Sequence, residues 1–102
     1  MDKAWKAWER RVAALFGGKR RGPGTGFGFS GEGKSDVEHE VFAIECKLYS
    51  RPTYGVMLEG VHQSERNSEG KVPLLIMRRK RDRWQDAMVC MRLETFLESG
   101  DV

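Results

Sequence analysis

The chain has 102 residues, of which 39% are hydrophobic, 32% charged and 10% aromatic. This length fits one compact domain, and the hydrophobic share is enough for a modest core, which excludes several domains and wholesale disorder. No segment approaches the roughly 18 consecutive apolar residues that span a bilayer, and the N-terminal segment lacks the apolar core of a signal peptide. The composition therefore predicts an intracellular, cytoplasmic protein without a membrane partner.

The charged residues are unevenly distributed, although the formal net charge is only +3. Residues 78–83 read RRKRDR, five basic residues of six, and residues 19–21 form a second basic cluster. Acidic residues gather instead between Glu32 and Glu45. Two basic patches beside an acidic centre favour a polyanion with a metal ion next to it. The alternative, equally common for charge runs, is a set of solvated turns.

The cysteines and histidines argue against a zinc site. Cys46 and Cys90 lie 44 residues apart and outside any CxxC pair, and the histidines are His39 and His62. A structural zinc ion needs four nitrogen or sulfur ligands at closer spacing. We therefore expect both cysteines to be buried, reduced thiols.

The first predicted element is a helix from about Lys3 to Phe16, capped by Asp2 and stopped by two glycines. At about 100° per residue, Glu9 falls at the edge of its apolar stripe. The helix alone favours an exposed charge there, because buried unpaired glutamates are rare. The alternative is a half-buried functional carboxylate. The stripe itself consists of Trp5, Trp8, Val12, Leu15 and Phe16.

A glycine-rich segment follows, with eight of the twelve glycines between residues 17 and 33. This density predicts a flexible loop over residues 17–34. Residues 36–48 predict a β-hairpin whose second strand runs from Val41 to Leu48. A second amphipathic helix follows Pro52 and ends near Asn67, and its apolar stripe consists of Tyr54, Met57, Leu58 and Val61.

Two strands and a short helix complete the chain. Residues 72–77 and 86–92 are apolar runs of strand length on either side of the basic turn. Leu93, Phe96 and Leu97 indicate a closing helix. The order of helix, β-hairpin, helix, two strands and helix predicts one α+β domain over residues 1–102, with a mixed β-sheet flanked by helices.

Residues 28–35 match the phosphate-loop pattern GxxxxGKS letter by letter. That loop works between a strand and a helix, because the helix N–H groups face the phosphates. Here glycines precede the segment and a predicted strand follows it. The chain is also too short for the repeated βα units of a nucleotide-binding domain, so we do not interpret the match as a nucleotide site.

The strand Val41 to Leu48 carries an acid and a base side by side. Side chains alternate along a strand, so Glu45 and Lys47 share one face, together with Val41 and Ala43. With a hairpin loop of two or four residues, Asp36 on the partner strand lands on this face near Glu45. An odd-numbered loop would turn it away unless a bulge intervened. The opposite, core face consists of Phe42, Ile44, Cys46 and Leu48.

Two carboxylates at one point repel each other unless a cation joins them, and hard oxygen ligands suit Mg²⁺ or Mn²⁺. Lys47 would then position a water molecule and neutralise charge on a phosphate. The alternative is a Glu–Lys surface pair on an edge strand, which contributes little. The combination of SD, eight residues and ECK, after a helix that bears Glu9, favours the metal site.

This array resembles the PD-(D/E)xK nuclease superfamily, and within it the archaeal-type Holliday junction resolvases and their viral relatives. Ser35 stands where the family has the proline of its motif. The resemblance implies a restriction-endonuclease-like fold over nearly the whole chain. The residues that match the family are Glu9 and Arg10 on the first helix, Arg21 or its neighbour Arg20, Asp36, Glu45, Lys47, and Gln63 on the second helix.

The resemblance also implies a function, that of a Mg²⁺- or Mn²⁺-dependent DNA endonuclease. Asp36, Glu45 and the backbone carbonyl of Cys46 would hold the metal, and Glu9 would contribute directly or through water. Lys47 would orient the attacking water. The expected substrate is a four-way DNA junction, selected by its shape and cut by paired symmetric nicks. The expected DNA-binding residues are Arg10, Arg20, Arg21, Gln63, Arg79, Lys80 and Arg81.

Two symmetric cuts require two sites, so a homodimer is expected if the substrate is a junction. Leu93, Phe96, Leu97 and the 54–67 helix are the candidate interface, and the alternative is that they close the core of one subunit. Two further functions stay open. One is another nicking or repair nuclease of the same superfamily, and the other is a non-catalytic basic module that binds nucleic acid.

Overall fold

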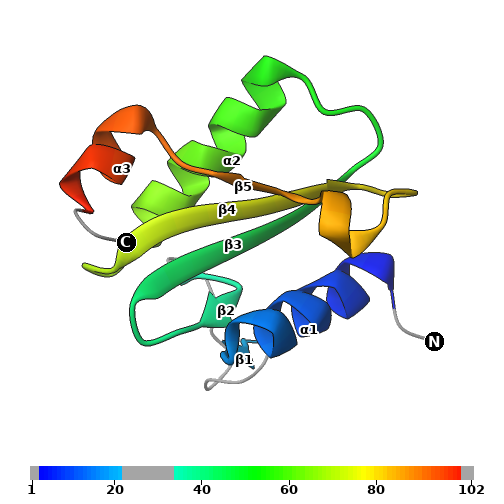
Figure 1. Cartoon of the computed structure of the whole chain (residues 1–102), viewed down its shortest axis with the longest axis horizontal. Helices are drawn as coiled ribbons and strands as arrows, with labels where there is room; N and C mark the ends of the chain where they lie inside the picture. The colour runs from blue at the N-terminus through cyan, green and yellow to red at the C-terminus, as the bar shows by residue number, and fades with distance from the viewer. Residues whose placement is uncertain (1–2, 22–33, 100–102) are drawn as a thin grey trace.

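The computed structural model describes residues 3–21 and 34–99 and contains a five-stranded mixed sheet with helices on both faces (Figure 1). The strands follow one another across the sheet in chain order, β1 to β5. The elements are α1 (Ala4–Phe16), β1 (Lys19–Arg20), β2 (Val37–Glu38), β3 (Phe42–Tyr49), α2 (Tyr54–Arg66), β4 (Val72–Arg79), the 3-10 helix η1 (Trp84–Asp86), β5 (Met88–Cys90) and α3 (Leu93–Glu98).

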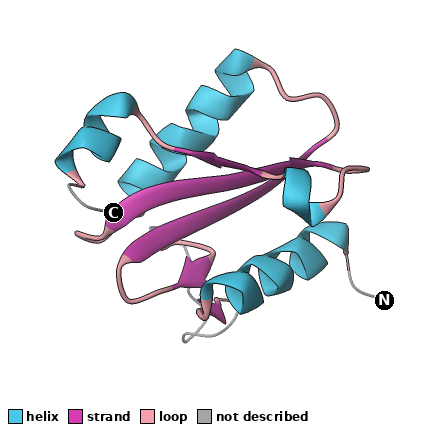
Figure 2. Ribbon diagram, in the orientation of Figure 1, coloured by secondary structure: helices cyan, strands magenta, loops and turns pink. Residues whose placement is uncertain are grey.

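The sheet is mixed because β3 and β4 run parallel, with α2 as the crossover between them (Figure 2). The other neighbouring strands pair antiparallel. The predicted α+β domain with a mixed sheet flanked by helices is therefore confirmed. The short strand β1 was not predicted: it occupies the start of the expected loop 17–34, most of which lies outside the described residues.

Both faces of the central strands are covered. On one face, α1 packs against β2, β3 and β4 through a cluster of Trp8, Val12, Ala13, Val37, Ile44, Cys46, Leu74 and Ile76. On the other face, α2 packs through Val61 onto Leu75 and Met77. This double coverage explains why β4 reads as a continuous apolar run rather than as an alternating pattern.

The buried face of α1 differs from the predicted stripe. Trp5 and Leu15 are exposed, whereas Glu9 and Ala13 are buried beside Trp8 and Val12. The buried positions 8, 9, 12 and 13 repeat at the helical period, so the face is shifted by one residue toward Glu9. The helix ends at Gly17, whose φ of 68° is left-handed, as expected from the glycine pair. The predicted cap Asp2 lies outside the described residues.

The contact face of α2 is also shifted from its predicted stripe. Tyr54 is exposed, whereas Val61 is buried as predicted, together with Gly60 and Ser64, which were not part of the stripe. A Cβ at Gly60 would lie 3.0 Å from the Leu75 side chain, so a glycine allows α2 to approach the sheet this closely. The helix begins at Thr53, whose Oγ1 accepts a hydrogen bond of 3.2 Å from the Val56 N–H.

The C-terminal part exposes most of its apolar side chains. The predicted strand 86–92 shortens to β5 and is preceded by η1. Because β5 is an edge strand, Met88 and Val89 remain exposed. Leu93, Phe96 and Leu97 are exposed by 72, 54 and 67%, so the alternative in which they close the core of one subunit is wrong for these three residues. It holds for Val61 of the 54–67 helix, which is part of the core.

Two sequence observations can be placed in this fold. The phosphate-loop match lies mostly outside the described residues, and its last residues lead into β2 rather than into a helix. None of the helices in the described part of the chain has the length and apolar character required to span a bilayer.

Candidate active site

Asp36 lies immediately before β2 and close to Glu45 on β3. Val37, the next residue, pairs with Ile44, and the Asp36 N–H donates a hydrogen bond of 2.9 Å to the Ile44 carbonyl. The charge of Asp36 raises the pKa of Glu45, so the two acids lie close together. Four residues connect the last paired positions, which is one of the two loop lengths that the sequence analysis required. The Nδ1 atom of His39 accepts hydrogen bonds from two backbone N–H groups of this connection, at 3.0 and 3.2 Å.

Asp36 directly precedes β2, and its side chain reaches the backbone of β3. Its Oδ2 accepts a hydrogen bond of 2.8 Å from the Cys46 N–H. The Ile44 carbonyl accepts the Asp36 N–H at 2.9 Å, and peptide groups face the same neighbour at every second residue of a strand. The Cys46 carbonyl therefore points toward Asp36, at a position that no residue of β2 covers.

Glu45 is fully buried, with 0% of its surface exposed. Asn67 donates a hydrogen bond of 2.9 Å to its Oε1, whereas its Oε2 is buried and accepts no hydrogen bond among residues 3–21 and 34–99. Burial, followed by the charge of Asp36, raises the pKa of Glu45 to about 8. The two carboxyl groups can share a hydrogen bond only if one of them is protonated, which also raises this pKa.

These facts correct one alternative from the sequence. A surface Glu–Lys pair on an edge strand is wrong for Glu45, because β3 is central and Glu45 is enclosed. A buried carboxylate with a free oxygen costs several kcal/mol unless a proton, a hydrogen-bond donor or a cation compensates it. Glu45 has one such donor, Asn67, for its two oxygens.

Glu9 enters the same charge cluster from α1. It is buried, and Arg20 donates a hydrogen bond of 2.8 Å from Nε to its Oε1. Burial and then the charge of Asp36 raise the pKa of Glu9, while Arg20 and Lys47 oppose the rise. The exposed position favoured from the helix alone is therefore wrong. Arg20 is part of β1, so this unpredicted strand supplies the partner of Glu9.

Lys47 is half-buried on the Glu45 side of β3, and its charge lowers the pKa of both Glu9 and Glu45. Cys46 points into the core on the opposite face, where burial raises its thiol pKa far above the usual range. Cys90 is half-buried, and burial raises its pKa as well. Both thiols are free, which confirms the prediction for Cys46 and in part for Cys90.

The donors at this point suit a hard divalent cation. Glu45 offers its unpaired Oε2, and Asp36 offers the carboxylate oxygen that does not bond Cys46. Strand alternation puts the Cys46 carbonyl on the same side. These are oxygen ligands of the kind that Mg²⁺ and Mn²⁺ prefer. Within the described ranges, no three side chains of histidine, cysteine, aspartate or glutamate converge as a metal-holding group. The candidate set therefore consists of two carboxylates and one carbonyl, with Glu9 adjacent.

The basic residues predicted near the site have carboxylate neighbours. Arg20 pairs with Glu9, as described above. Arg21 is half-buried, and its side chain lies 3.6 Å from Glu69 and 4.0 Å from Glu38. Arg10 is exposed on α1.

The basic turn after β4 is partly neutralised by its own acids. Arg79 pairs with Asp82 at 3.1 Å, and Arg83 pairs with Asp86 at 3.2 Å. Lys80 and Arg81 are exposed. The turn therefore presents less net charge than its sequence suggests.

Asn67 is the site residue that the sequence analysis missed. It directly follows α2 and reaches Glu45, whereas Gln63 is half-buried one turn earlier. Positions 60, 64 and 67 repeat at helical spacing, and the first two of them are buried. This repeat of small or polar residues along one face of the helix was the sequence signal that could have placed Asn67 near the sheet.

Comparison with known proteins gives no further guide. No family model, no curated protein and no solved structure matches this chain.

Proposed function

We propose that this chain is a metal-dependent, structure-selective DNA endonuclease with a restriction-endonuclease-like fold, and that its substrate is a four-way junction. The proposal combines the resemblance of the motif residues to the PD-(D/E)xK superfamily with the arrangement of the same residues in space. The order of elements, with a parallel β3–α2–β4 unit and an antiparallel hairpin before it, is compatible with that fold.

One observation carries the proposal: Glu45 is a fully buried carboxylate with an unpaired oxygen, set against a second carboxylate, Asp36. A protein that needed these residues only for stability would gain by replacing one of them, because the pair is mutually repulsive and costly to bury. A divalent cation held by Asp36, Glu45 and the Cys46 carbonyl removes that cost. Such an ion supplies Lewis-acid activation of a phosphodiester and of water.

The protein side chains around the pair have complementary tasks. Lys47 brings a positive charge to the Glu45 side of β3, where it stabilises the negative charge that develops on a phosphate during hydrolysis. Arg20 fixes Glu9 beside Asp36 through a short, charge-assisted hydrogen bond. Arg10, Arg21, Gln63 and the residues 79–81 are the proposed DNA-backbone contacts, whose affinity falls as salt increases.

The test is cleavage of a synthetic four-way junction with Mg²⁺, with a linear duplex and a Y-fork of the same sequences as controls. We expect paired symmetric nicks in the junction, and loss of all cutting in Asp36→Asn, because that variant removes a metal ligand and its charge. Equal cutting of all three substrates would replace the junction resolvase with a general nicking or repair nuclease. Tight, salt-sensitive binding with no cutting would replace the nuclease with a non-catalytic binding module.

A junction resolvase needs two sites, and we propose that a second copy of this chain docks on the apolar face formed by α2, β5 and α3. An apolar groove with a volume of about 630 Å³ lies between these elements. Exposed apolar patches of this kind commonly mark interaction surfaces. The residues that line the groove include Tyr54, Met57, Val89, Leu93 and Phe96.

The substitution Phe96→Glu is expected to convert the dimer to a monomer, because a carboxylate would be buried in an apolar interface. Phe96 is 54% exposed, so the fold of each subunit should persist. Sedimentation equilibrium of the wild type and the variant measures the change, with Glu98→Lys on the same helix as the control. A wild type that is monomeric at the concentrations where it cuts both strands would contradict this interface.

A further inference from the structure

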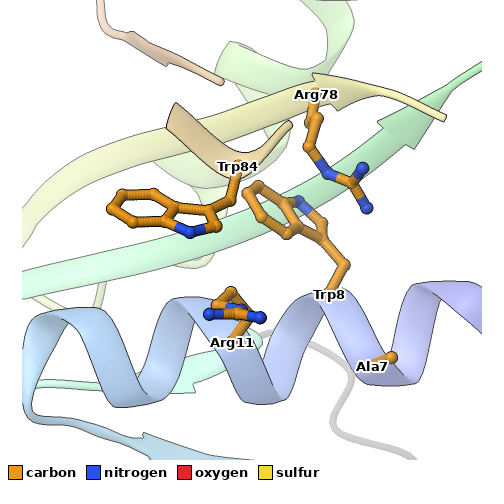
Figure 3. Close-up of a pocket in the computed structure, with 5 residues that line it drawn as sticks. All are labelled: Ala7, Trp8, Arg11, Arg78 and Trp84. Atoms are coloured by element: carbon orange, nitrogen blue, oxygen red, sulfur yellow. The ribbon is translucent and has the colours of Figure 1, made fainter. Parts of the chain in front are cut away.

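A second cavity lies on the α1 side of the sheet, away from the paired carboxylates. Its volume is about 230 Å³, and it is lined by Ala7, Trp8, Arg11, Arg78 and Trp84 (Figure 3). Trp8 and Arg11 come from α1, Arg78 comes from the end of β4, and Trp84 begins η1. None of these residues belongs to the proposed metal site or to the DNA contacts named above.

The lining residues combine aromatic rings with positive charge. The Arg78 guanidinium lies 4.7 Å from the centre of the Trp8 ring, a cation–π distance. Arg78 also donates a hydrogen bond of 2.6 Å to the Asp82 carbonyl, which holds the turn that leads to Trp84. Trp8 is buried, so the stacked pair forms a rigid floor, with Trp8 between Arg78 and Trp84 in Figure 3.

Trp84 and Arg11 are the accessible members of the cavity. Trp84 is 41% exposed although it is a large aromatic residue. Arg11 rises from α1 beneath the two indole rings (Figure 3) and is also exposed. Among the described residues no carboxylate pairs with Arg11, and the lining contains no acidic residue. The cavity therefore offers a flat ring for stacking and two cations for an anion.

We propose that this cavity binds one unpaired nucleotide of a single-stranded DNA segment, with its base stacked on Trp84 and its phosphate on Arg11. Stacking on an exposed aromatic ring beside cationic side chains is how single strands are bound without sequence readout. The volume lies below the roughly 300 Å³ at which pockets for drug-sized ligands begin, so it fits one base rather than a larger cofactor.

Binding of a nucleotide in this cavity does not require nuclease activity; only its role in selecting branched DNA rests on the proposed function. Trp8 and Glu9 are neighbours on α1, so one helix would contact both a splayed nucleotide and the scissile region of the same DNA. A branched DNA offers bases that can leave the stack at its branch point, whereas an intact duplex does not. The cavity would thereby contribute to selection of branched over linear DNA.

The experiment measures binding of a fluorescent thymidine octamer in the presence of a chelator, so that cleavage plays no part. A second octamer with abasic sites carries the same phosphates without bases. We expect the wild type to bind the base-containing octamer about 5- to 150-fold more tightly than the abasic one, the range for stacking of one base. Trp84→Ala should lose this preference, and Trp84→Phe should keep most of it.

Arg11→Ala should weaken binding of both octamers, whereas the control Arg66→Ala, an exposed arginine on α2, should weaken binding less. A Trp84→Ala variant that keeps the base preference would overturn the proposal, and so would a wild type that binds both octamers equally. Junction cleavage is scored separately. If the base preference depends on Trp84 but the protein cuts no DNA, the nucleotide-binding proposal stands and the nuclease proposal fails. If the protein cuts junctions but shows no such preference, only the nucleotide-binding proposal fails.

Discussion

Replacing Glu45 by glutamine is expected to lower the rate of junction cleavage by on the order of 10²- to 10³-fold or more, a loss typical of removing one preorganised charged group from an active site. Glutamine has nearly the same shape, and its carbonyl oxygen can still accept the hydrogen bond that Asn67 donates. The substitution therefore removes a metal-binding charge from the site without opening a cavity. Affinity for the junction should change little, because the proposed DNA contacts lie elsewhere.

Single-turnover cleavage in Mg²⁺ and junction binding in Ca²⁺ or chelator measure the two effects separately. The matched control is Glu40→Gln, the same chemical change at an exposed position of the β2–β3 connection. It should cleave at the wild-type rate. Undiminished cleavage by Glu45→Gln would show that the buried pair does not hold the catalytic metal, and an equal loss in the control would point to a general effect of charge on DNA binding.

The sequence sufficed to predict the proximity of Asp36 and Glu45, because strand geometry decides it. Period-two alternation and an even hairpin loop were enough to predict that Asp36 lies near Glu45, because the four-residue loop fixes the register up to Val37 and Asp36 is the next residue. The order of the elements followed from apolar periodicity and from the positions of glycine and proline. Each of these signals is local in the chain.

The remaining features depend on contacts between distant segments. Glu9 looked exposed because its helix alone does not reveal that Arg20, eleven residues later, supplies a cation to a buried carboxylate. Asn67 was missed because its partner is 22 residues away, on the strand before α2. The sequence could not show whether the apolar face of α3 packs on its own core or on another chain, because an amphipathic helix has the same sequence pattern in both cases.

The pH dependence of folding should distinguish this buried pair from ordinary surface charges. In a chelator, we expect the free energy of unfolding to fall as the pH rises from about 5 to 9. Glu45 has a pKa of about 8 in the folded protein, against 4.5 when unperturbed. Between these values the folded state holds one more proton than the unfolded state, so stability is fully present below the lower pKa and is lost through the upper one, by at most about 1.4 kcal/mol per pH unit.

Urea denaturation of the wild type, Glu45→Gln and Asp36→Asn across this pH range isolates the contribution of the pair. Glu45→Gln has no titrating group at position 45, so it should match the wild type near pH 5 and exceed its stability by a few kcal/mol near pH 9. Asp36→Asn should lie between them, because loss of the Asp36 charge lowers the pKa of Glu45. Parallel curves for all three proteins would contradict the proton-sharing pair.

The same experiment with saturating Mg²⁺ links stability to function. A cation and a proton compete for the Glu45 oxygen, so metal affinity should rise as the pH increases toward 8 and the proton leaves. Added Mg²⁺ should therefore stabilise the wild type most at high pH, where the unprotonated pair is least stable. It should have little effect on Glu45→Gln at any pH. If the two carboxylates serve to bind a metal, the metal-free protein should be least stable at the pH where the metal binds most tightly. A carboxylate pair with only a structural role would not show this inverse relation between stability and metal affinity.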